Sequence, residues 1–276
     1  MDSTDRLDGL ELITRAPHPR LRGLVRGYEG YVETATALRR QQVPGDIVPL
    51  IISYGEPVGL IDPRRPGEMD RRNVFVAGLS DTYVVTESSP SYGVQINFTP
   101  IGARMFLGIP MSELTNRTIG LDDAFGAEGA RLVERLHGAR DWEKRFAMLD
   151  AAILTRIDAA PPPSEAVVLA WYRLNRSGGK ASIASLAEEL GWSGKHLIAQ
   201  FRDQVGLAPK TAARVIRFNA AIRRLRSGVS LDWADVVAEC GYYDQAHLLR
   251  EFREFAGMTP REFLRGQLPR MAAFSD

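Results

Sequence analysis

Residues 183–209 read IASLAEELGWSGKHLIAQFRDQVGLAP, and residues 233–260 read WADVVAECGYYDQAHLLREFREFAGMTP. Each stretch predicts an apolar helix, a turn at a glycine, and a second helix that carries polar and basic residues. Each stretch ends in a glycine, two further residues and a proline, which predicts a helix stop followed by a new helix. The second helices are expected to begin after Ser193 and Asp244, which are 244 − 193 = 51 positions apart, so the chain contains a repeated helix-turn-helix unit.

A repeated unit of this kind indicates sequence-specific DNA binding. The major groove of B-DNA admits one helix, and a second helix can hold it at a fixed angle so that a few side chains reach the base edges. Between the copies, Thr211–Arg226 contains neither glycine nor proline, and its 16 residues predict a helix of about 24 Å. Such a spacer can place both recognition helices in successive major grooves, about 34 Å apart. The alternative interpretation is a pair of three-helix units that only pack and do not touch DNA.

The last hundred residues, approximately, resemble the AraC/XylS family of bacterial transcription regulators. The family signature is Ala-x-x-x-Gly-aromatic, two phenylalanine-like anchors, and then Gly-x-x-Pro. The sequence contains it as Cys240-Gly241-Tyr242, Leu248, Phe252, Gly257-Met258-Thr259-Pro260, Phe263 and Arg265. Three positions depart from the family pattern: Leu248 replaces the first aromatic anchor, Asp244 replaces the usual serine cap, and Ala199 replaces a frequent basic residue.

The resemblance and the helical phase together give the residues expected at DNA. They are Ser193, Lys195, His196, Ile198, Ala199 and Arg202 in the first unit, and Gln245, Ala246, His247, Leu249, Arg250 and Arg253 in the second. Arg250 can pair with guanine and Gln245 with adenine, and each such contact is worth about 1–3 kcal/mol of discrimination. Lys195, Arg202 and Arg253 fit phosphate contacts equally well, and those position the protein without specifying a sequence.

Three of these residues, His196, His247 and Ala199, need a separate interpretation. For His196 and His247, partly buried packing or a phosphate contact is as reasonable as base readout. Ala199 lies on the expected DNA face, so the first unit is expected to read bases by apolar contact with thymine methyl groups, or to contribute less specificity.

Length and composition fit two globular domains, since 276 residues exceed the usual size of one core and 45% hydrophobic residues is ordinary. Residues 165–276 contain 16 Lys+Arg and 12 Asp+Glu, a net charge of 16 − 12 = +4, which leaves 19 − 22 = −3 for residues 1–164. The basic excess lies in the half with the repeated units, as DNA phosphates require. The prolines at 161–163 predict a linker over residues 159–164, between an N-terminal domain, 1–158, and a C-terminal domain, 165–270.

The N-terminal half predicts strands followed by a pair of helices. Short apolar runs between glycine, proline and aspartate indicate a β-sandwich or barrel over residues 20–110. The runs are Val25–Val32, Asp46–Tyr54, Val58–Asp62, Val74–Val76, Thr82–Thr86 and Tyr92–Phe98. Residues 121–157 predict two helices with a break at Gly138. The apolar stripe from Trp142 to Ile157 fits packing on the chain's own strands and packing in a dimer interface equally well. The expected fold class is therefore α+β, with a β-rich N-terminal domain and an all-α C-terminal double helix-turn-helix domain.

The resemblance implies that the N-terminal half is a cupin-like β-barrel that binds a small-molecule effector and helps the protein to form a homodimer. Residues 97–110 resemble the sensor half of a subgroup of these regulators. The aromatic residues Tyr54, Tyr83, Tyr92 and Phe98 are candidates for the wall of an effector pocket, although packing in the core of a small barrel is the more ordinary role for aromatics at strand spacing.

An enzyme, a metal site and a cofactor are not expected. The four histidines, at positions 18, 137, 196 and 247, show no His-x-His or His-Glu-x-x-His spacing, and neither a Gly-x-Ser-x-Gly elbow nor a phosphate-binding glycine loop occurs. The single cysteine, Cys240, is expected to be a buried structural thiol. No apolar run approaches the roughly 20 residues of a membrane span, and residues 1–5 are polar and acidic, so a cytoplasmic protein is expected.

Together these patterns predict a transcription factor whose partner is double-stranded promoter or operator DNA, with RNA polymerase as a further partner if the protein is an activator. Whether it activates or represses depends on where its site lies relative to the promoter, which the sequence does not contain. The alternatives are an architectural DNA binder that needs no effector and, with less support, an enzyme built on the barrel.

Overall fold

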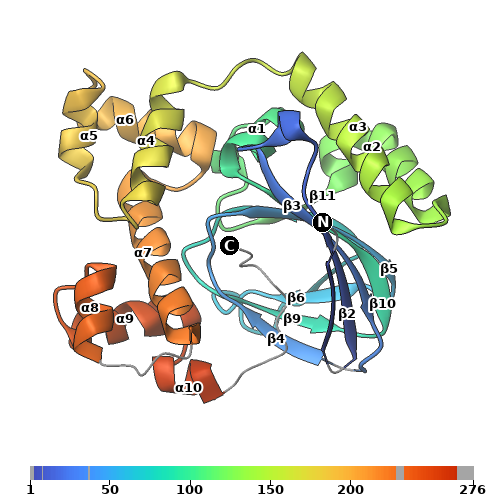
Figure 1. The fold of residues 1–276 in the computed structure, drawn as a ribbon, viewed down its shortest axis with the longest axis horizontal. Helices are drawn as coiled ribbons and strands as arrows, with labels where there is room; N and C mark the ends of the chain where they lie inside the picture. The colour runs from blue at the N-terminus through green and yellow to red at the C-terminus, as the bar shows by residue number, and fades with distance from the viewer. Residues whose placement is uncertain (1–2, 8, 37, 228–232, 266–276) are drawn as a thin grey trace.

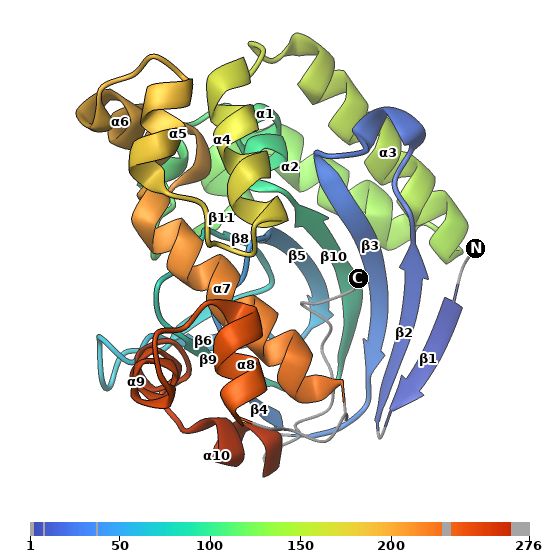
Figure 2. The ribbon, with the colours of Figure 1, turned by 60° about the vertical axis from the view of Figure 1, so that its left-hand side comes forward.

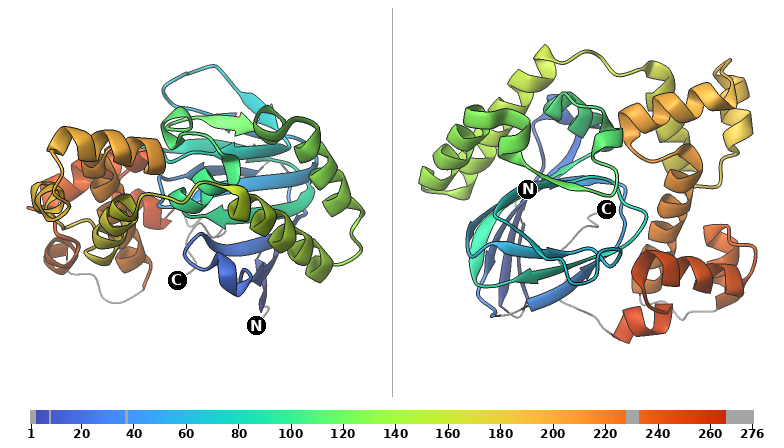
Figure 3. Two further views of the ribbon diagram at one scale, coloured as in Figure 1. Left: turned by 90° about the horizontal axis from the view of Figure 1, so that it is seen from above. Right: turned by 180° about the vertical axis from the view of Figure 1, so that it is seen from behind.

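The computed structural model describes residues 3–7, 9–36, 38–227 and 233–265. Two β-sheets and the helices packed on them form the N-terminal half, and the described part of the C-terminal half contains helices and no strands (Figure 1). In Figure 3 the C-terminal helices lie on one side of the sheets, and the helix pair that follows the strands lies on another.

All paired strands are antiparallel. The seven-stranded sheet has the order β1 (Ser3–Leu7), β2 (Leu10–Arg15), β3 (Val25–Glu33), β10 (Ser91–Phe98), β5 (Val48–Gly55), β8 (Val74–Ala77) and β11 (Thr118–Gly120). The four-stranded sheet has the order β4 (Leu38–Gln42), β9 (Val84–Ser88), β6 (Val58–Ile61) and β7 (Asp70–Arg72).

The expected barrel is not a closed one. The chain leaves the larger sheet after β3 and after β5, and it then pairs both β4 and β6 with β9. Within the described ranges, no backbone pairing joins the two sheets. The α+β class with a β-rich N-terminal half is correct, and the sheets form an open sandwich.

All six predicted apolar runs form strands, namely β3, β5, β6, β8, β9 and β10. Five strands lie outside those predictions. Two of them, β4 with the sequence LRRQQ and β7 with DRR, are almost entirely polar, so hydropathy does not mark them. Strand β11 has only three residues, and β1 and β2 precede residue 20.

The two helices after the strands cover the outer face of the larger sheet. They are α2 (Leu121–Gly138) and α3 (Trp142–Ala159), with the predicted break at Gly138. The indole of Trp142 lies on Gly30 of β3, where a Cβ atom would come within 2.6 Å of the ring. Phe146 is fully buried and stacks on Tyr28 at 5.7 Å, so the apolar stripe of α3 packs on the chain's own sheet.

Three short helical segments lie between the longer elements of the N-terminal half. They are η1 (Pro19–Leu21), α1 (Pro100–Leu107) and η2 (Met111–Glu113). Helix α1 begins at Pro100 because the Thr99 hydroxyl accepts a hydrogen bond from the backbone N–H of Gly102 at 3.1 Å. Both α1 and η2 contact the first recognition helix, and one hydrophobic core extends from the sheets into the C-terminal helices.

The C-terminal half consists of seven helices in the described ranges. They are α4 (Glu165–Arg176), α5 (Ile183–Glu189), α6 (Gly194–Val205), α7 (Pro209–Arg226), α8 (Trp233–Cys240), α9 (Gln245–Ala256) and α10 (Pro260–Arg265). Figure 2 shows α5 and α6 near one end of α7, and α8 and α9 near the other. Of the predicted C-terminal domain, residues 228–232 and 266–270 lie outside the described residues.

Candidate nucleic-acid interface

The two recognition helices, α6 and α9, begin and end in the same way. The Ser193 hydroxyl accepts a hydrogen bond from the backbone N–H of His196 at 3.2 Å, and the Asp244 carboxylate accepts one from His247 at 2.6 Å. Gly206 ends α6 with a φ of 104°, and Gly257 ends α9 with a φ of 64°. These positive φ values explain why glycine stands at the same place in both copies.

The inward faces of both helices fix which residues point outward. Helix α6 buries Leu197, Phe201 and Val205, and α9 buries Leu248, Phe252 and Phe255. The ring of Phe218, on α7, meets Phe252 and Phe255 edge to face at 4.9 and 5.2 Å. Helix α9 is therefore held on α7 by aromatic packing, and its opposite face is left to solvent.

The outward face of α6 carries the residues that the sequence predicted. Lys195, His196, Ala199 and Arg202 are exposed, and Ile198 is 38% exposed, which is unusual for so large an apolar side chain. No described residue forms an ion pair with Lys195 or Arg202. Helix α6 thus presents two positively charged side chains, Lys195 and Arg202, that have no ion-pair partner among the described residues. The exposed apolar side chains of Ile198 and Ala199 lie beside them.

The outward face of α9 is more polar. Gln245, Ala246, Arg250 and Arg253 are exposed, and Leu249 is half-buried. Arg250 has no ion-pair partner within the described part of the chain, so its guanidinium is available for a base or a phosphate.

His247 occupies a different environment from the other predicted contacts. Its Nδ1 accepts a hydrogen bond from the backbone N–H of Tyr243 at 3.3 Å, and its Nε2 lies 3.5 Å from a Glu251 carboxylate oxygen. The ring also lies edge to face with Tyr242 at 5.2 Å. These contacts pack His247 against its neighbours, as one alternative expected, while its side chain stays 30% exposed and its contact with DNA stays a prediction.

An ion-pair network that the sequence did not suggest fixes α9 on α7. Glu251 is only 2% exposed, and its carboxylate accepts hydrogen bonds from Arg214 at 2.7 Å and from Arg217 at 3.1 Å. Burial raises the pKa of Glu251, but these two hydrogen bonds outweigh it and hold the pKa below its usual range. The sequence signal for this network is the position of Glu251. It is a charged residue on the buried face of the helix, between Leu248 and Phe255.

The N-terminal half touches both recognition helices where they end. Thr115, which follows η2, donates a hydrogen bond from its hydroxyl to the backbone carbonyl of Gly206 at 2.8 Å. Gln41, in β4, donates from its side-chain amide to the carbonyl of Ala256, and the ring of Tyr83 covers Gly257 so closely that a Cβ atom there would collide with it. Since 257 − 206 = 51, the two contacts fall at equivalent places in the repeat.

A third contact reinforces the first of these two. Arg104, on α1, forms an ion pair with Asp203 of α6 at 3.1 Å. Asp203 lies in the last turn of the helix, so the N-terminal half binds the carboxyl end of α6 and leaves Lys195, Ala199 and Arg202 exposed.

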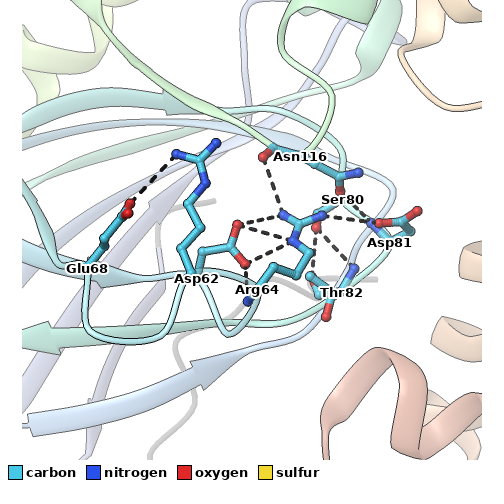
Figure 4. Close-up of polar contacts among 8 residues, drawn as sticks. Asp62, Arg64, Glu68, Ser80, Asp81, Thr82 and Asn116 are labelled. Atoms are coloured by element: carbon cyan, nitrogen blue, oxygen red, sulfur yellow. Dashed lines mark hydrogen bonds and ion pairs between the residues drawn. The ribbon is translucent and has the colours of Figure 1, made fainter.

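A polar cluster around Arg64 connects the two contact regions (Figure 4). The Arg64 guanidinium binds the Asp62 carboxylate at 2.8 Å, lies 3.6 Å from Asp81, and donates to the backbone carbonyl of Asn116 at 3.4 Å. The Asn116 side chain in turn accepts from the backbone N–H of Asp81 at 3.0 Å. Asn116 adjoins Thr115, and Asp81 lies two residues before Tyr83, so the two segments that reach the recognition helices are tied together.

The four aromatic residues predicted for an effector pocket lie in three different places. Tyr54 and Tyr92 pack on each other at 5.2 Å and on His137 of α2. Phe98 is fully buried and stacks on Phe106 at 4.9 Å, so it is a core residue. Tyr83 lies at Gly257, as described above. The cavity between the two sheets is instead lined by other residues, among them Tyr31, Glu33, Arg40, Leu60, Phe75 and Gln95.

Three further observations concern metal ligands, the cysteine and membrane-spanning helices. In the ranges described, no group of three or more His, Cys, Asp or Glu residues is placed to hold a metal ion. Cys240 is buried, and that burial raises the pKa of its thiol. Among the same residues, no helix combines the length and the apolar character that crossing a membrane requires.

Comparisons with known proteins also identify a helix-turn-helix domain in the region of the repeated units. Residues 186–266 match the model of a helix-turn-helix domain, and residues 13–120 match that of a domain of unknown function (DUF6597). The uncharacterized HTH-type transcriptional regulator YbfI of Bacillus subtilis (strain 168) is 30% identical over 96 residues, which are 34% of this chain and 34% of that protein. The matching region therefore spans about a third of that relative.

Two solved structures are similar at low sequence identity. Apo ToxT from Vibrio cholerae matches with a TM-score of 0.47 and 11% identity, over 95% of this chain and 98% of that one. The C-terminal domain of AraT, a response regulator from Geobacillus stearothermophilus, matches with a TM-score of 0.36 and 21% identity, over 42% of this chain and 95% of that one. On the paired units, the signature from Cys240 to Pro260 and the match over residues 186–266, the C-terminal half is a helix-turn-helix domain of the AraC/XylS type.

Proposed function

We propose that this protein controls transcription by binding a two-part DNA site, with one short block of bases for each recognition helix. The observation that supports this most strongly is the pair of outward faces on α6 and α9, whose Lys195, Arg202 and Arg250 lack ion-pair partners among the residues described. The helices are joined by α7, whose 18 residues give a length of about 27 Å. Each helix can then enter a separate major-groove segment on one face of the duplex.

The two helices make different contributions to specificity in this proposal. Arg250 and Gln245, on α9, hydrogen-bond to guanine and adenine, and Arg253 binds phosphate. On α6, Ile198 and Ala199 touch thymine methyl groups while Lys195 and Arg202 bind phosphates. The block read by α9 is consequently the more sharply defined of the two.

The domain boundaries form part of the same proposal. Residues 1–158 make the effector-sensing part, residues 159–164 the linker, and residues 165–270 the DNA-binding part. Helix α3 ends at Ala159 and α4 begins at Glu165, which supports a linker there. A homodimer and a contact with RNA polymerase stay predictions of the family resemblance.

The contacts at Gly206 and Gly257 support the proposal that a small molecule controls DNA binding. The N-terminal half holds both recognition helices by their carboxyl ends, so any change in the sheets or in the Arg64 cluster alters the relative position of the helices. A ligand that favours one arrangement of the sheets then shifts the population of DNA-binding geometries.

The direct experiment is selection of bound duplexes from a random DNA pool by the full-length protein at near-physiological salt. Two conserved blocks with a fixed spacing are expected. Enrichment of one block only would mean that α6 does not read bases, and no enrichment in the presence of measurable, salt-sensitive binding would indicate a nonspecific architectural binder.

A further inference from the structure

A cavity of about 170 Å³ lies between the two sheets. Its walls are formed by β3, β5, β8, β10 and β11 from the larger sheet and by β4, β6 and β9 from the smaller one. A cavity of about 150 Å³ in another protein holds benzene, so the space here suits a molecule of about one ring with a small substituent.

Most of the cavity wall is apolar. The apolar side chains include Ile47, Ile51, Val58, Leu60, Phe75 and Leu79. A wall of this kind selects a ligand whose body is apolar, and a few polar groups then fix its orientation.

One part of the wall contains a buried ion pair that crosses from one sheet to the other. Glu33, at the end of β3, binds Arg40 of β4, and the two residues are 3% and 4% exposed. Arg40 also donates a hydrogen bond from Nη1 to the Ser88 hydroxyl at 3.1 Å. Glu33 Oε1 and Arg40 Nε have no hydrogen-bond partner in the described chain, and both atoms are buried out of reach of the cavity. The pair therefore contributes its charges to the wall, and hydrogen bonds to a ligand are left to the neighbouring polar side chains, among them Ser88, Ser91 and Gln95.

The same pair decides which charge a ligand can carry. The carboxylate and the guanidinium cancel each other, and the remaining polar residues on the wall are neutral, among them Gln42, Thr86, Ser88, Ser91 and Gln95. A charged ligand would be buried there without a counter-ion, which is unfavourable.

From these observations we infer that the cavity binds an uncharged, mainly apolar molecule of about one ring, which carries one hydrogen-bond donor and one acceptor for the neutral polar side chains beside the Glu33–Arg40 pair. This inference rests on the proposed control of DNA binding by a small molecule, and it defines the chemical class of that molecule.

The cavity wall is continuous with the segments that reach the recognition helices. Arg40 and Gln42, which line the cavity, flank Gln41, and Thr82 and Val84, which also line it, flank Tyr83. A ligand in the cavity therefore lies directly behind the contacts to Ala256 and Gly257.

Four probes of similar size test the inference on the full-length protein without DNA. They are neutral benzamide, anionic benzoate, cationic benzamidinium and apolar toluene, and their affinities are measured by ligand-observed NMR titration. We expect saturable binding of benzamide at least tenfold tighter than that of either ion or of toluene. Equal or tighter binding of an ion or of toluene, or no saturable binding by any of the four, would overturn the inference.

Glu33→Gln sharpens the test because it leaves the Arg40 guanidinium without its counter-ion. The variant is expected to prefer benzoate over benzamide by at least tenfold, whereas an unchanged order would contradict the role of the pair. Glu87→Gln is the matched control, since Glu87 pairs with Arg39 at 3.7 Å on the exposed side of the neighbouring strand. If Glu33→Gln does not fold, the order of the affinities of the four probes for the unaltered protein is the test of the inference.

The DNA measurement distinguishes this inference from the proposed function. Benzamide binding that leaves the affinity for the selected DNA site unchanged would support the ligand class and contradict control by that ligand. Failure of the probe-free protein to bind any selected DNA would contradict the proposed function, whatever the order of the four probes.

Discussion

Gly206 and Gly257 stand 51 residues apart at the same position of the two helix-turn-helix units, and each is a point where the N-terminal half meets a recognition helix. The contacts themselves are unrelated, since Thr115 hydrogen-bonds to one glycine and the ring of Tyr83 covers the other. Because the contact points are equivalent, a change in the sheets can act on both recognition helices together.

Gly257→Ala is expected to be more damaging than Gly191→Ala. Both glycines have left-handed φ values, 64° and 65°, so alanine costs about 1–2 kcal/mol at either position. At Gly191 a Cβ atom meets nothing within 4 Å, whereas at Gly257 it collides with Tyr83 and adds about 1–3 kcal/mol. The free energy of unfolding, measured in urea, checks this.

A double-mutant cycle with Tyr83→Ala tests whether the collision with Tyr83 causes the extra loss of stability in Gly257→Ala. Combined with Gly257→Ala, Tyr83→Ala is expected to recover most of the extra loss, because the collision partner is gone. Additive losses in the double variant would show that Tyr83 does not contact Gly257 in solution.

Arg250→Ala is expected to weaken binding to the selected DNA site by about 1–3 kcal/mol, since a guanine contact is lost. Binding to random DNA should change little. Fluorescence anisotropy at one fixed salt concentration measures both, and Arg131→Ala, an exposed arginine on α2, serves as the control. Equal losses on specific and random DNA would assign Arg250 to the phosphate backbone.

Glu251→Ala is expected to destabilise the protein by about 3–5 kcal/mol, because it leaves Arg217 and Arg214 without their buried partner. Glu254→Ala is the comparison, since Glu254 also pairs with Arg214 but its side chain is 51% exposed. That exposed pair should contribute less than about 1 kcal/mol. Similar losses for both variants in thermal unfolding would mean that the buried network does not hold α9 on α7.

Glu29 is expected to make the stability fall as the pH rises toward neutrality. Burial raises the pKa of Glu29 from 4.5 to about 7, although a hydrogen bond from Asn97 partly offsets this. Between these values the folded protein retains a proton that the unfolded chain has lost, so the stability falls by about 1.4 kcal/mol per pH unit. The penalty is absent below pH 4.5 and complete above about pH 7.

Glu29→Gln removes this titration and keeps an acceptor for Asn97, whose side-chain amide lies 2.7 Å from the Glu29 carboxylate. The variant should be the more stable protein at pH 8, and its stability should be flatter between pH 5 and 7. Parallel pH profiles for the variant and the unaltered protein, from urea unfolding, would contradict the raised pKa.

The parts of the fold that local chemistry determines could be predicted from the sequence. Ser193 and Asp244 cap the recognition helices as expected, and Gly206 and Gly257 end them, because capping depends on residues a few positions apart. The apolar strands could also be predicted, because a local run of apolar residues marks each of them. The polar strand β4 could not be predicted in this way, because its pairing with β9 is a long-range contact.

The candidate site was predicted less completely. Helical phase placed Lys195, Ala199 and Arg250 on outward faces, as the structure has them. It did not reveal that His247 is engaged by Tyr243 and Glu251, because that contact depends on how α7, α8 and α9 pack. For the same reason, the ion pair between Glu33 and Arg40 was not predicted, since it joins two different sheets.

Changing the spacing of the selected DNA site tests whether both recognition helices of one chain read a single two-part site. Inserting about five base pairs between the two blocks turns one block to the opposite face of the duplex. We expect a loss of affinity of at least about tenfold, close to that of a site with one block scrambled. Inserting ten base pairs is not expected to restore the full affinity, because α7 fixes the separation of the two helices. Affinity that stays the same after the five-base-pair insertion would contradict the claim.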